Sequence, residues 1–440
     1  MTGEGPIARL LKVVAKIEAN EIKATVLSFL FIFTLMAAYF ILRPVRDAMS
    51  SDWSDAELSL LWTSTFVFSV IAVSLYGGII SRIRFGRLVP SVYGFFAATF
   101  VAFWFGSTQV ADSTLIDKAF YVWISVFSLF HVSVFWSFMS AIYSKDQAPR
   151  LFAIIAMGAS VGAIVGPIIP TFLADDLGTM NLMLIAALLL LVPLPLIGML
   201  ERLKVTELGN ADVHVDIGAQ STLGKNPFSG FMLLVRNPFL LAIAVFIIFY
   251  VIMNTFIYFE LRKLLTDMDR EARTQVWASI DLAVNSLAIL TAIFATSRLA
   301  TRFGMAATLA LIPLFMVGGW LVVAAAPLLA VLAGLQIARR AGNYAITRPG
   351  REMLFTLVDS ETRFKAKPVI DIVVYRGGDM MTAWLYTTIT AILGFGLTGV
   401  ALIATALAAA WATVGIYLGR AYNRTDSEQA AAAVASEARP

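Results

Sequence analysis

The chain of 440 residues lacks cysteine and has only two histidines, His131 and His214. Without cysteine there are no disulfides, thiol nucleophiles or thiolate metal sites, and two histidines are too few for a histidine metal cage. Charged residues make up 14% of the chain, against about 25% in soluble proteins. The net charge of +4 is too small to indicate nucleic-acid binding. We therefore expect no metal site, no cofactor and no nucleic-acid partner.

Hydrophobic residues, in contrast, make up 59% of the sequence, and the mean hydropathy is +0.81. Apolar stretches long enough to cross the hydrocarbon core of a bilayer recur along the whole chain. They lie near residues 24–47, 57–80, 88–107, 119–143, 151–174, 180–200, 238–260, 274–297, 305–325, 330–357, 368–393 and 395–419. The sequence thus predicts an all-α membrane protein with twelve transmembrane helices.

The predicted spans fall into two groups of six. Residues 1–200 form an N-terminal six-helix bundle, 201–237 a cytoplasmic linker, 238–420 a C-terminal six-helix bundle and 421–440 a disordered tail. Before the first span, apolar residues at helical spacing alternate with Arg9, Lys12 and Lys16. This pattern fits either a basic amphipathic helix on the membrane surface or simply the solvated start of the first span.

Lys and Arg concentrate in the loops on the side of both termini, which predicts that the termini are cytoplasmic. We expect a monomer in the inner membrane of a bacterium.

The two halves of the chain share a tripeptide, since Arg84-Phe85-Gly86 follows the second span and Arg302-Phe303-Gly304 follows the eighth. Parallel six-helix repeats are typical of the major facilitator fold, and residues 78–87 resemble its loop signature after the second helix.

Charged residues inside predicted spans mark candidate cavities, because a charge at the bilayer centre costs about 2.5–3.5 kcal/mol on insertion scales. With α-helical geometry, Arg340, Tyr344, Arg348 and Arg351 of the tenth span lie on one face. Their guanidinium groups suit phosphate or carboxylate oxygens, and Pro349 makes the helix irregular. Alternatively, this segment is a cytoplasmic loop with solvated arginines.

The end of the first span contains Arg43, Arg46 and Asp47. Arg43 and Asp47 are four residues apart and can pair, which leaves Arg46 for an anionic substrate. The alternative is that these residues extend to the membrane interface. Further charged residues are candidates for coupling or for pairs between the bundles: Asp47, Glu260, Asp281, Glu352, Asp371, Arg376 and Asp379. Gly158, Gly162 and Gly166 of the fifth span predict close helix packing.

Two segments resemble the nucleotide translocases of intracellular bacteria and plastids, a family allied to the major facilitators. They are residues 39–47, with the run Leu42-Arg43-Pro44-Val45-Arg46-Asp47, and residues 351–379, which end in Arg376-Gly377-Gly378-Asp379. Basic residues of the first and tenth helices contribute to nucleotide exchange in that family, and by motif position they correspond to Arg46 and Arg351. The resemblance therefore implies a shared architecture and phosphate-type contacts at these two residues, whereas ATP/ADP exchange itself does not follow from it. The chain departs from the family at Pro44, where an aspartate is common, and in the fourth span, so it resembles a divergent member.

The leading hypothesis is a secondary active transporter that moves an organic anion, such as a nucleotide or another phosphorylated metabolite, by alternating access. Arg43, Arg46, Arg340, Tyr344, Arg348 and Arg351 would bind the substrate. The alternatives are movement of a phospholipid or lysolipid, proton-coupled transport of another substrate, and a membrane sensor that transports nothing. We expect no enzyme activity and no catalytic residues, because no acyltransferase or hydrolase motif is present.

Overall fold

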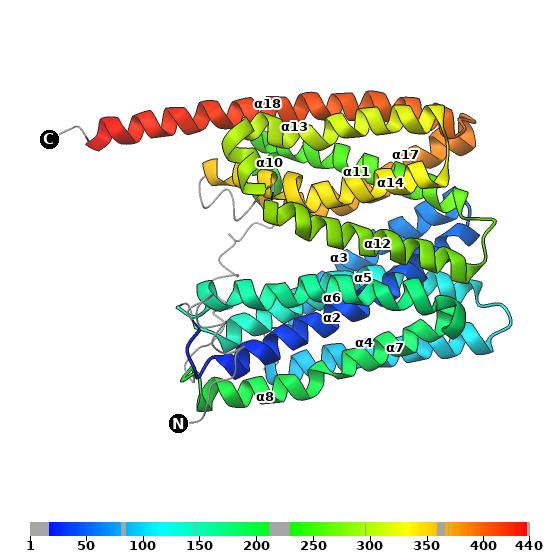
Figure 1. Cartoon of the computed structure of the whole chain (residues 1–440), viewed down its shortest axis with the longest axis vertical. Helices are drawn as coiled ribbons and strands as arrows, with labels where there is room; N and C mark the ends of the chain where they lie inside the picture. Colours follow the sequence, from blue (N-terminus) through cyan, green and yellow to red (C-terminus); the bar gives the residue numbers. More distant parts are fainter. Residues whose placement is uncertain are drawn as a thin grey trace. The chain divides into compact units, whose positions relative to one another are not determined.

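The computed structural model describes residues 17–437, except for 81–84, 145, 211–228, 295, 359–365 and 368. Within these residues every regular element is a helix (Figure 1). The predicted basic lead-in, half of the predicted linker and Arg84 of the repeated tripeptide lie outside the described residues.

The helices follow the predicted spans closely. The first half of the chain forms α2 (Ile22–Met49), η1 (Ser50–Asp52), α3 (Asp55–Ile80), α4 (Phe85–Gln109), α5 (Thr114–Ile142), α6 (Ala148–Leu177), η2 (Thr179–Asn181), α7 (Leu182–Leu191) and α8 (Pro193–Thr206). The second half forms α10 (Ser229–Arg236), α11 (Pro238–Leu264), α12 (Arg270–Phe294), α13 (Thr296–Ala325), α14 (Leu329–Gly342), η3 (Asn343–Thr347), α15 (Arg348–Leu354), η4 (Phe355–Leu357), η5 (Val369–Val374), α17 (Tyr375–Thr387), η6 (Thr388–Ile392) and α18 (Leu397–Glu437).

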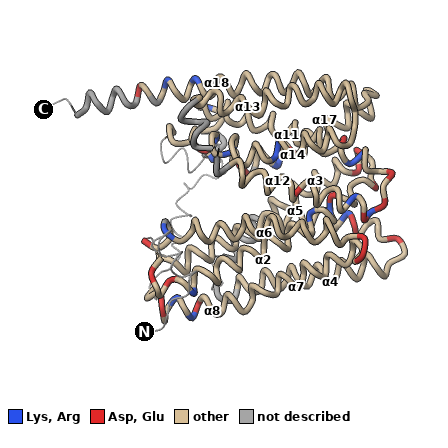
Figure 2. Tube along the Cα trace, in the orientation of Figure 1, with Lys and Arg blue, Asp and Glu red and all other residues tan. Residues whose placement is uncertain are grey.

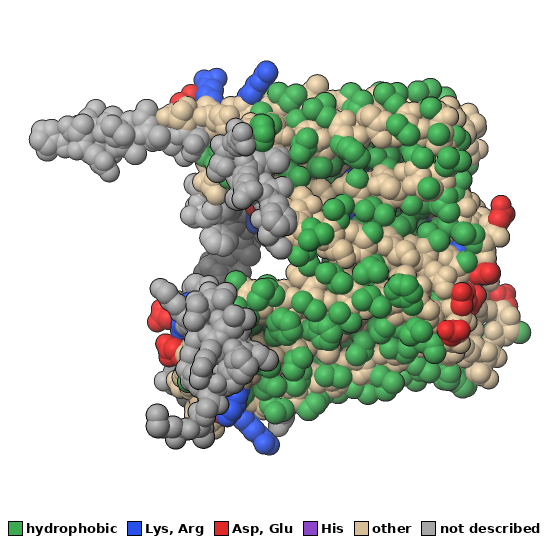
Figure 3. Space-filling view, viewed as in Figure 1, with side chains coloured by type: hydrophobic (Ala, Val, Ile, Leu, Met, Phe, Trp, Pro, Cys, Tyr) green, Lys and Arg blue, Asp and Glu red, His purple; other side chains and the backbone are tan. Residues whose placement is uncertain are grey.

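In the described part of the chain, nine helical stretches are long and apolar enough to cross a membrane. The three other predicted spans correspond to α12, to α14 through η4, and to η5 through η6, which are also helical. These three carry more polar residues or π-helical turns than the nine. In the space-filling view, apolar side chains cover the helices on the visible face (Figure 3). Such a surface matches the hydrocarbon core of a bilayer.

Two elements differ from the sequence prediction. The sixth span is divided into α7 and α8, because Pro193 has no N–H to continue the hydrogen-bond ladder. The predicted disordered tail, 421–440, instead continues α18 as a helix to Glu437. Alanine-rich sequence such as 430–435 has the highest intrinsic helix propensity, which explains why the helix extends beyond the apolar residues.

The chain divides into two compact units, each described here by itself. The first comprises Met1–Asp52, Val67–Ile217 and Met268–Leu282, and the second comprises Trp53–Phe66, Gly218–Asp267 and Ala283–Pro440. The predicted boundaries at 200 and 238 therefore differ from the observed grouping at two places. The start of α3 belongs to the second unit, and the start of α12 belongs to the first.

Close packing of α2 against α6 forms part of the core of the first unit (Figure 1). A Cβ atom on Gly158, Gly162 or Gly166 of α6 would lie 2.3 to 2.7 Å from a backbone oxygen of α2. No side chain fits at that distance, so the three glycines allow the two backbones to touch. The predicted packing role of these glycines is confirmed.

In the second unit, α13 and α18 run side by side (Figure 1). A Cβ atom on Gly415 of α18 would lie 2.9 Å from the Leu309 carbonyl oxygen, and one on Gly419 would lie 2.2 Å from the Ala306 Cα. Both units therefore use small residues, rather than apolar side chains alone, to bring helices together in an apolar environment.

Candidate substrate-binding site

Most charged residues lie near the ends of the helices, and long stretches between them are uncharged (Figure 2). The exceptions include the residues that the sequence singled out. They occur in three groups: one on α2 and the start of α12 in the first unit, and in the second unit one on α14 through α17 and one at the end of α11.

In the first unit, two arginines of α2 pair with two buried aspartates. Arg43 lies 3.6 Å from Asp47 through its Nε atom and 3.3 Å from Asp281 through Nη1. Arg46 binds Asp47 with its Nη2 atom 2.6 Å from Oδ1. Asp47 and Asp281 are 1% and 2% exposed, so these ion pairs are well shielded from water. The structure thus brings together four of the predicted residues, and Asp281 reaches Arg43 because the start of α12 belongs to this unit.

The Arg46 side chain has further partners on α5. Its Nη1 atom donates a hydrogen bond to the Ser125 hydroxyl at 3.3 Å, and its guanidinium lies 5.3 Å from the centre of the Tyr121 ring. Arg46 is therefore oriented by an acid, a hydroxyl and an aromatic face at the same time. Tyr39, one turn before Arg43, stacks on His131 of α5 with ring centroids 4.7 Å apart.

In the second unit, α14 carries two adjacent buried arginines, Arg339 and Arg340, which are 0% and 3% exposed. The Nη2 atom of Arg339 donates to the Asn254 Oδ1 atom at 2.7 Å and to the Gln336 Oε1 atom at 2.9 Å. Its guanidinium lies 5.1 Å from the centre of the Tyr250 ring. Arg340 is therefore packed inside the helical unit, and in this structure it is not part of a solvated loop.

The predicted stripe of four residues on the tenth span is interrupted. Residues Asn343–Thr347 form a π-helical turn, in which the Arg348 N–H donates to the Asn343 carbonyl. A π turn contains more residues than an α turn, so the faces before and after it no longer align. Arg340 is buried, whereas Tyr344 and Arg348 are exposed. The irregularity expected from Pro349 is present, but the common face is not.

Beyond the π turn, Arg351 belongs to a separate cluster. Its Nη2 atom lies 2.9 Å from Glu352 and 3.2 Å from Asp371, and Lys367 binds Glu352 at 2.5 Å. Arg376 and Asp379 lie 3.9 Å apart on α17. In this conformation Arg351 is therefore engaged with two carboxylates.

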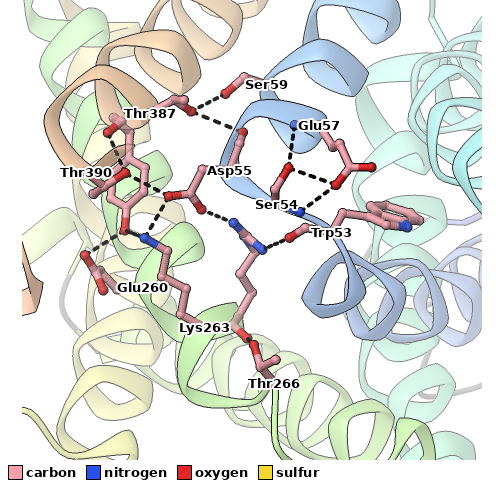
Figure 4. A network of polar contacts seen from close by, with 12 residues as sticks. Trp53, Ser54, Asp55, Glu57, Ser59, Glu260, Lys263, Thr266, Thr387 and Thr390 are labelled. Carbon is pink, nitrogen blue, oxygen red and sulfur yellow. Dashed lines mark hydrogen bonds and ion pairs between the residues drawn. The ribbon is translucent and has the colours of Figure 1, made fainter. Parts of the chain in front are cut away.

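The predicted coupling residue Glu260 lies in a third group, at the end of α11, which we call the Asp55 network (Figure 4). The Tyr386 hydroxyl donates to Glu260 at 2.7 Å and accepts from the Lys263 ammonium at 3.0 Å. Lys263 also pairs with Asp55 of α3 at 2.8 Å, and Arg262 pairs with the same carboxylate. Glu260 is only 4% exposed.

A comparison with known protein families identifies the superfamily of this chain. The sequence model of the Major Facilitator Superfamily matches residues 24–346, which is more than half of the chain. The chain belongs to the Major Facilitator Superfamily. It is therefore, by fold, a secondary transporter and not an enzyme.

Solved structures of major facilitators have the same fold. One is a bacterial homolog of the human lysosomal transporter Spinster in an inward-facing, unoccupied conformation, with a TM-score of 0.58 and 11% identity over 93% of this chain and 99% of that chain. Another is the nucleoside transporter NupG, with a TM-score of 0.60 and 14% identity over 91% of this chain and 99% of that chain. No curated protein matches the sequence.

This major facilitator protein has a second charge network, in its first unit. Arg270 at the start of α12 lies 2.9 Å from Asp52 and 3.0 Å from Asp117 of α5, and Arg273 also pairs with Asp52. The arrangement complements the Asp55 network. An acidic start of α3 meets basic residues of α11, and a basic start of α12 meets acidic residues around α2 and α5.

Sequence reasoning missed Arg339, Asp55 and Arg262 as functional candidates. Arg339 fell outside the stripe predicted by a regular α-helix, although Asn254 on the seventh span was a signal that a polar partner existed. The two charge networks were not predicted, because charged residues at the ends of membrane spans usually contact lipid headgroups and water. Among the described residues, no group of three His, Asp or Glu side chains could hold a metal ion.

Proposed function

We propose that this protein is a secondary active transporter of an organic anion. One observation carries the proposal, the excess of positive charge in the polar helices of the second unit. Between Leu329 and Thr387, the described residues include six basic and three acidic side chains: Arg339, Arg340, Arg348, Arg351, Lys367 and Arg376 against Glu352, Asp371 and Asp379. An excess of cations at membrane depth is costly unless an anion compensates it.

Burial strengthens this argument. Arg339 and Arg340 are at most 3% exposed, so water screens their charges weakly and an approaching anion would interact with them strongly. The cluster around α2 in the first unit differs, because its two arginines meet two aspartates. The second unit therefore supplies the electrostatic attraction, and Arg43 and Arg46 can bind substrate only by exchanging their partners.

The chemistry of the cations favours a phosphorylated or carboxylated substrate. Guanidinium groups bind the paired oxygens of phosphate and carboxylate with two parallel hydrogen bonds. The resemblance of residues 39–47 and 351–379 to nucleotide translocases supports a nucleotide as the substrate. We propose exchange rather than proton symport, because an empty cationic site is costly to carry through the membrane.

The test is counterflow in proteoliposomes that contain the purified protein. Vesicles loaded with unlabelled AMP, glucose 6-phosphate or citrate should accumulate the labelled form of the transported anion. Adenosine is the matched control for AMP, since it has the same base and sugar without the phosphate. Accumulation of adenosine but of none of the anions would overturn the proposal. Activity that persists with lipid alone would instead favour lipid movement.

We further propose that the protein is a monomer of a bacterial inner membrane with both termini in the cytoplasm. The asymmetric distribution of Lys and Arg supports this orientation. The orientation depends on the charges of the loops and not on the substrate. A test that contradicts anion transport would therefore leave the proposed orientation unchanged.

A further inference from the structure

Arg339 is the most deeply buried arginine in the described part of the chain, with no exposed surface. Its side chain extends from α14 toward α11, where the Asn254 amide oxygen accepts a hydrogen bond from Nη2. Gln336, one turn earlier on α14, accepts the second hydrogen bond of the same nitrogen. The Tyr250 ring lies 5.1 Å from the guanidinium carbon. All three contacts are with neutral side chains.

Two other buried arginines among the described residues have acidic partners. Arg262 is 2% exposed and pairs with Asp55, and Arg273 is 7% exposed and pairs with Asp52. Arg339, in contrast, pairs with no carboxylate of the described residues, and its Nε and Nη1 atoms are buried without a hydrogen-bond acceptor. A buried cation whose charge and donors are both uncompensated is unusual, because the cost of desolvation is then not recovered.

The surroundings hold this guanidinium in place without neutralising it. Two amide oxygens fix Nη2, and the Tyr250 ring lies against the cation. Two of the three guanidinium nitrogens therefore keep donors for another group. The π-helical turn that begins at Asn343, one turn further along, is a type of distortion that often accompanies functional sites.

We infer that Arg339 contacts the substrate anion, and that a phosphate or carboxylate oxygen of the substrate supplies the missing counter-charge. This inference rests on the proposed function and adds a residue to it. Asn254, Gln336 and Tyr250 are positioning residues, which hold the guanidinium while leaving its charge available. The residues around Arg339 must separate to admit the anion, as alternating access requires of an enclosed site.

The deciding experiment gives Arg339 a permanent counter-charge. In the variant Asn254→Asp, a carboxylate replaces the amide oxygen that lies 2.7 Å from the guanidinium, so an ion pair forms within the protein. Asn254→Ser is the matched control, because it keeps a neutral acceptor. Thermal unfolding of each full-length protein is measured against increasing AMP and citrate, together with counterflow of the anion that the wild type transports.

We expect Asn254→Asp to be at least as stable as the wild type without ligand. It should need about tenfold more anion, or more, for the same stabilisation, because an internal carboxylate competes for Arg339. Asn254→Ser should respond to anion as the wild type does. An Asn254→Asp variant with undiminished anion response and counterflow would overturn the inference, since Arg339 would then be purely structural.

A second variant covers the case in which an introduced acid disturbs the fold. Gln336→Glu places the carboxylate on α14 itself, next to the same nitrogen, and should weaken the anion response in the same way. If either acidic variant folds and keeps the wild-type response, Arg339 does not bind the anion. A wrong proposed function would give another result. In that case the wild-type protein itself would not be stabilised by any organic anion and would not exchange one.

Discussion

Arg340 lies next to Arg339 on α14 and is nearly as deeply buried. Its predicted contribution to anion binding can be tested separately from that of its neighbour. We expect Arg340→Gln to reduce anion exchange about tenfold or more, since a hydrogen bond to a charged group contributes about 1.5–3 kcal/mol. The measurement is the initial rate of counterflow in proteoliposomes with equal amounts of protein.

The control for this prediction is Arg424→Gln on the last part of α18. That arginine is exposed and pairs with Glu428, so its loss should leave exchange unchanged. Equal rates for wild type and Arg340→Gln would show that burial of Arg340 serves stability alone. A loss in both variants would point to a general effect of the chain's net charge.

At the scale of single residues, the sequence located the polar positions inside the spans but not their roles. Arg43, Asp47 and Asp281 were visible as charges at membrane depth, and the structure pairs them. Arg339 and Arg340 are neighbours in sequence, so a regular helical projection assigns them to different faces. Which of the two arginines reaches a polar partner depends on Asn254 and Tyr250 of α11. Such contacts between distant segments produce no pattern in the local sequence, so the sequence could not predict them.

At the scale of helix pairs, the glycines of α6 offer a sharp test. A Cβ atom at Gly162 would lie 2.3 Å from the Phe33 carbonyl oxygen of α2. We expect Gly162→Ala to lower the free energy of unfolding by about 1–3 kcal/mol, because the two backbones must move apart. Thermal unfolding in detergent measures the effect.

Gly198 of α8 provides the matched control, since a Cβ atom there would meet nothing within 4 Å. Gly198→Ala should be neutral or slightly stabilising, because alanine favours the helix by up to about 1 kcal/mol. Similar unfolding temperatures for the two alanine variants would contradict the view that close backbone contact holds α2 and α6 together.

The start of α3 and the end of α17 form another pair of segments that can be tested directly. The hydroxyls of Ser59 and Thr387 lie 2.8 Å apart, close to the Asp55 network (Figure 4). With two C–O bonds added to this separation, the β-carbons are at most about 5.6 Å apart, so a disulfide needs only a small adjustment of the two helices. Since the chain has no cysteine, a pair introduced here has no competitor.

We expect the double variant Ser59→Cys, Thr387→Cys to form a disulfide under oxidising conditions and to stop transport. In a major facilitator, alternating access moves the helices of one sequence repeat against those of the other. Ser59 comes from the first half of the chain and Thr387 from the second, so the disulfide would tie the two halves together although both residues belong to the second unit in this structure. Reduction should restore transport, and each single variant should be insensitive to oxidation. Full transport by the cross-linked protein would mean that α3 and α17 stay together throughout the cycle.

The elements themselves were largely predictable, and the exceptions have physical causes. Long apolar runs fix the helices from α2 to α13 because only helices satisfy the backbone inside a bilayer. The π turn Asn343–Thr347 could not be predicted from the sequence. Its backbone hydrogen bonds join residues five apart because of packing, and the spacing of apolar residues does not reveal this change. The tail was misjudged because alanine-rich segments without an apolar stripe still favour a helix, as in α18.

At the scale of the whole molecule, the orientation in the membrane remains a prediction from loop charges. The absence of cysteine makes it testable with two single substitutions. Asp112→Cys lies between α4 and α5, and Arg424→Cys lies at the end of the apolar stretch Leu397–Thr425 of α18. We expect a membrane-impermeant thiol reagent to label Asp112→Cys in intact cells and Arg424→Cys only after the membrane is broken. The reverse pattern would place both termini outside.

The exchange of helix segments between the two units has a consequence for the integrity of the chain. Each unit includes a stretch from the opposite half of the sequence, Trp53–Phe66 in one and Met268–Leu282 in the other. A polypeptide cut between α8 and α10 would thus yield two fragments that each lack a piece of their own core. Produced singly, they should be degraded; produced together, they should rebuild an intact protein, with Asp52 and Asp55 recovering their arginine partners from the other fragment.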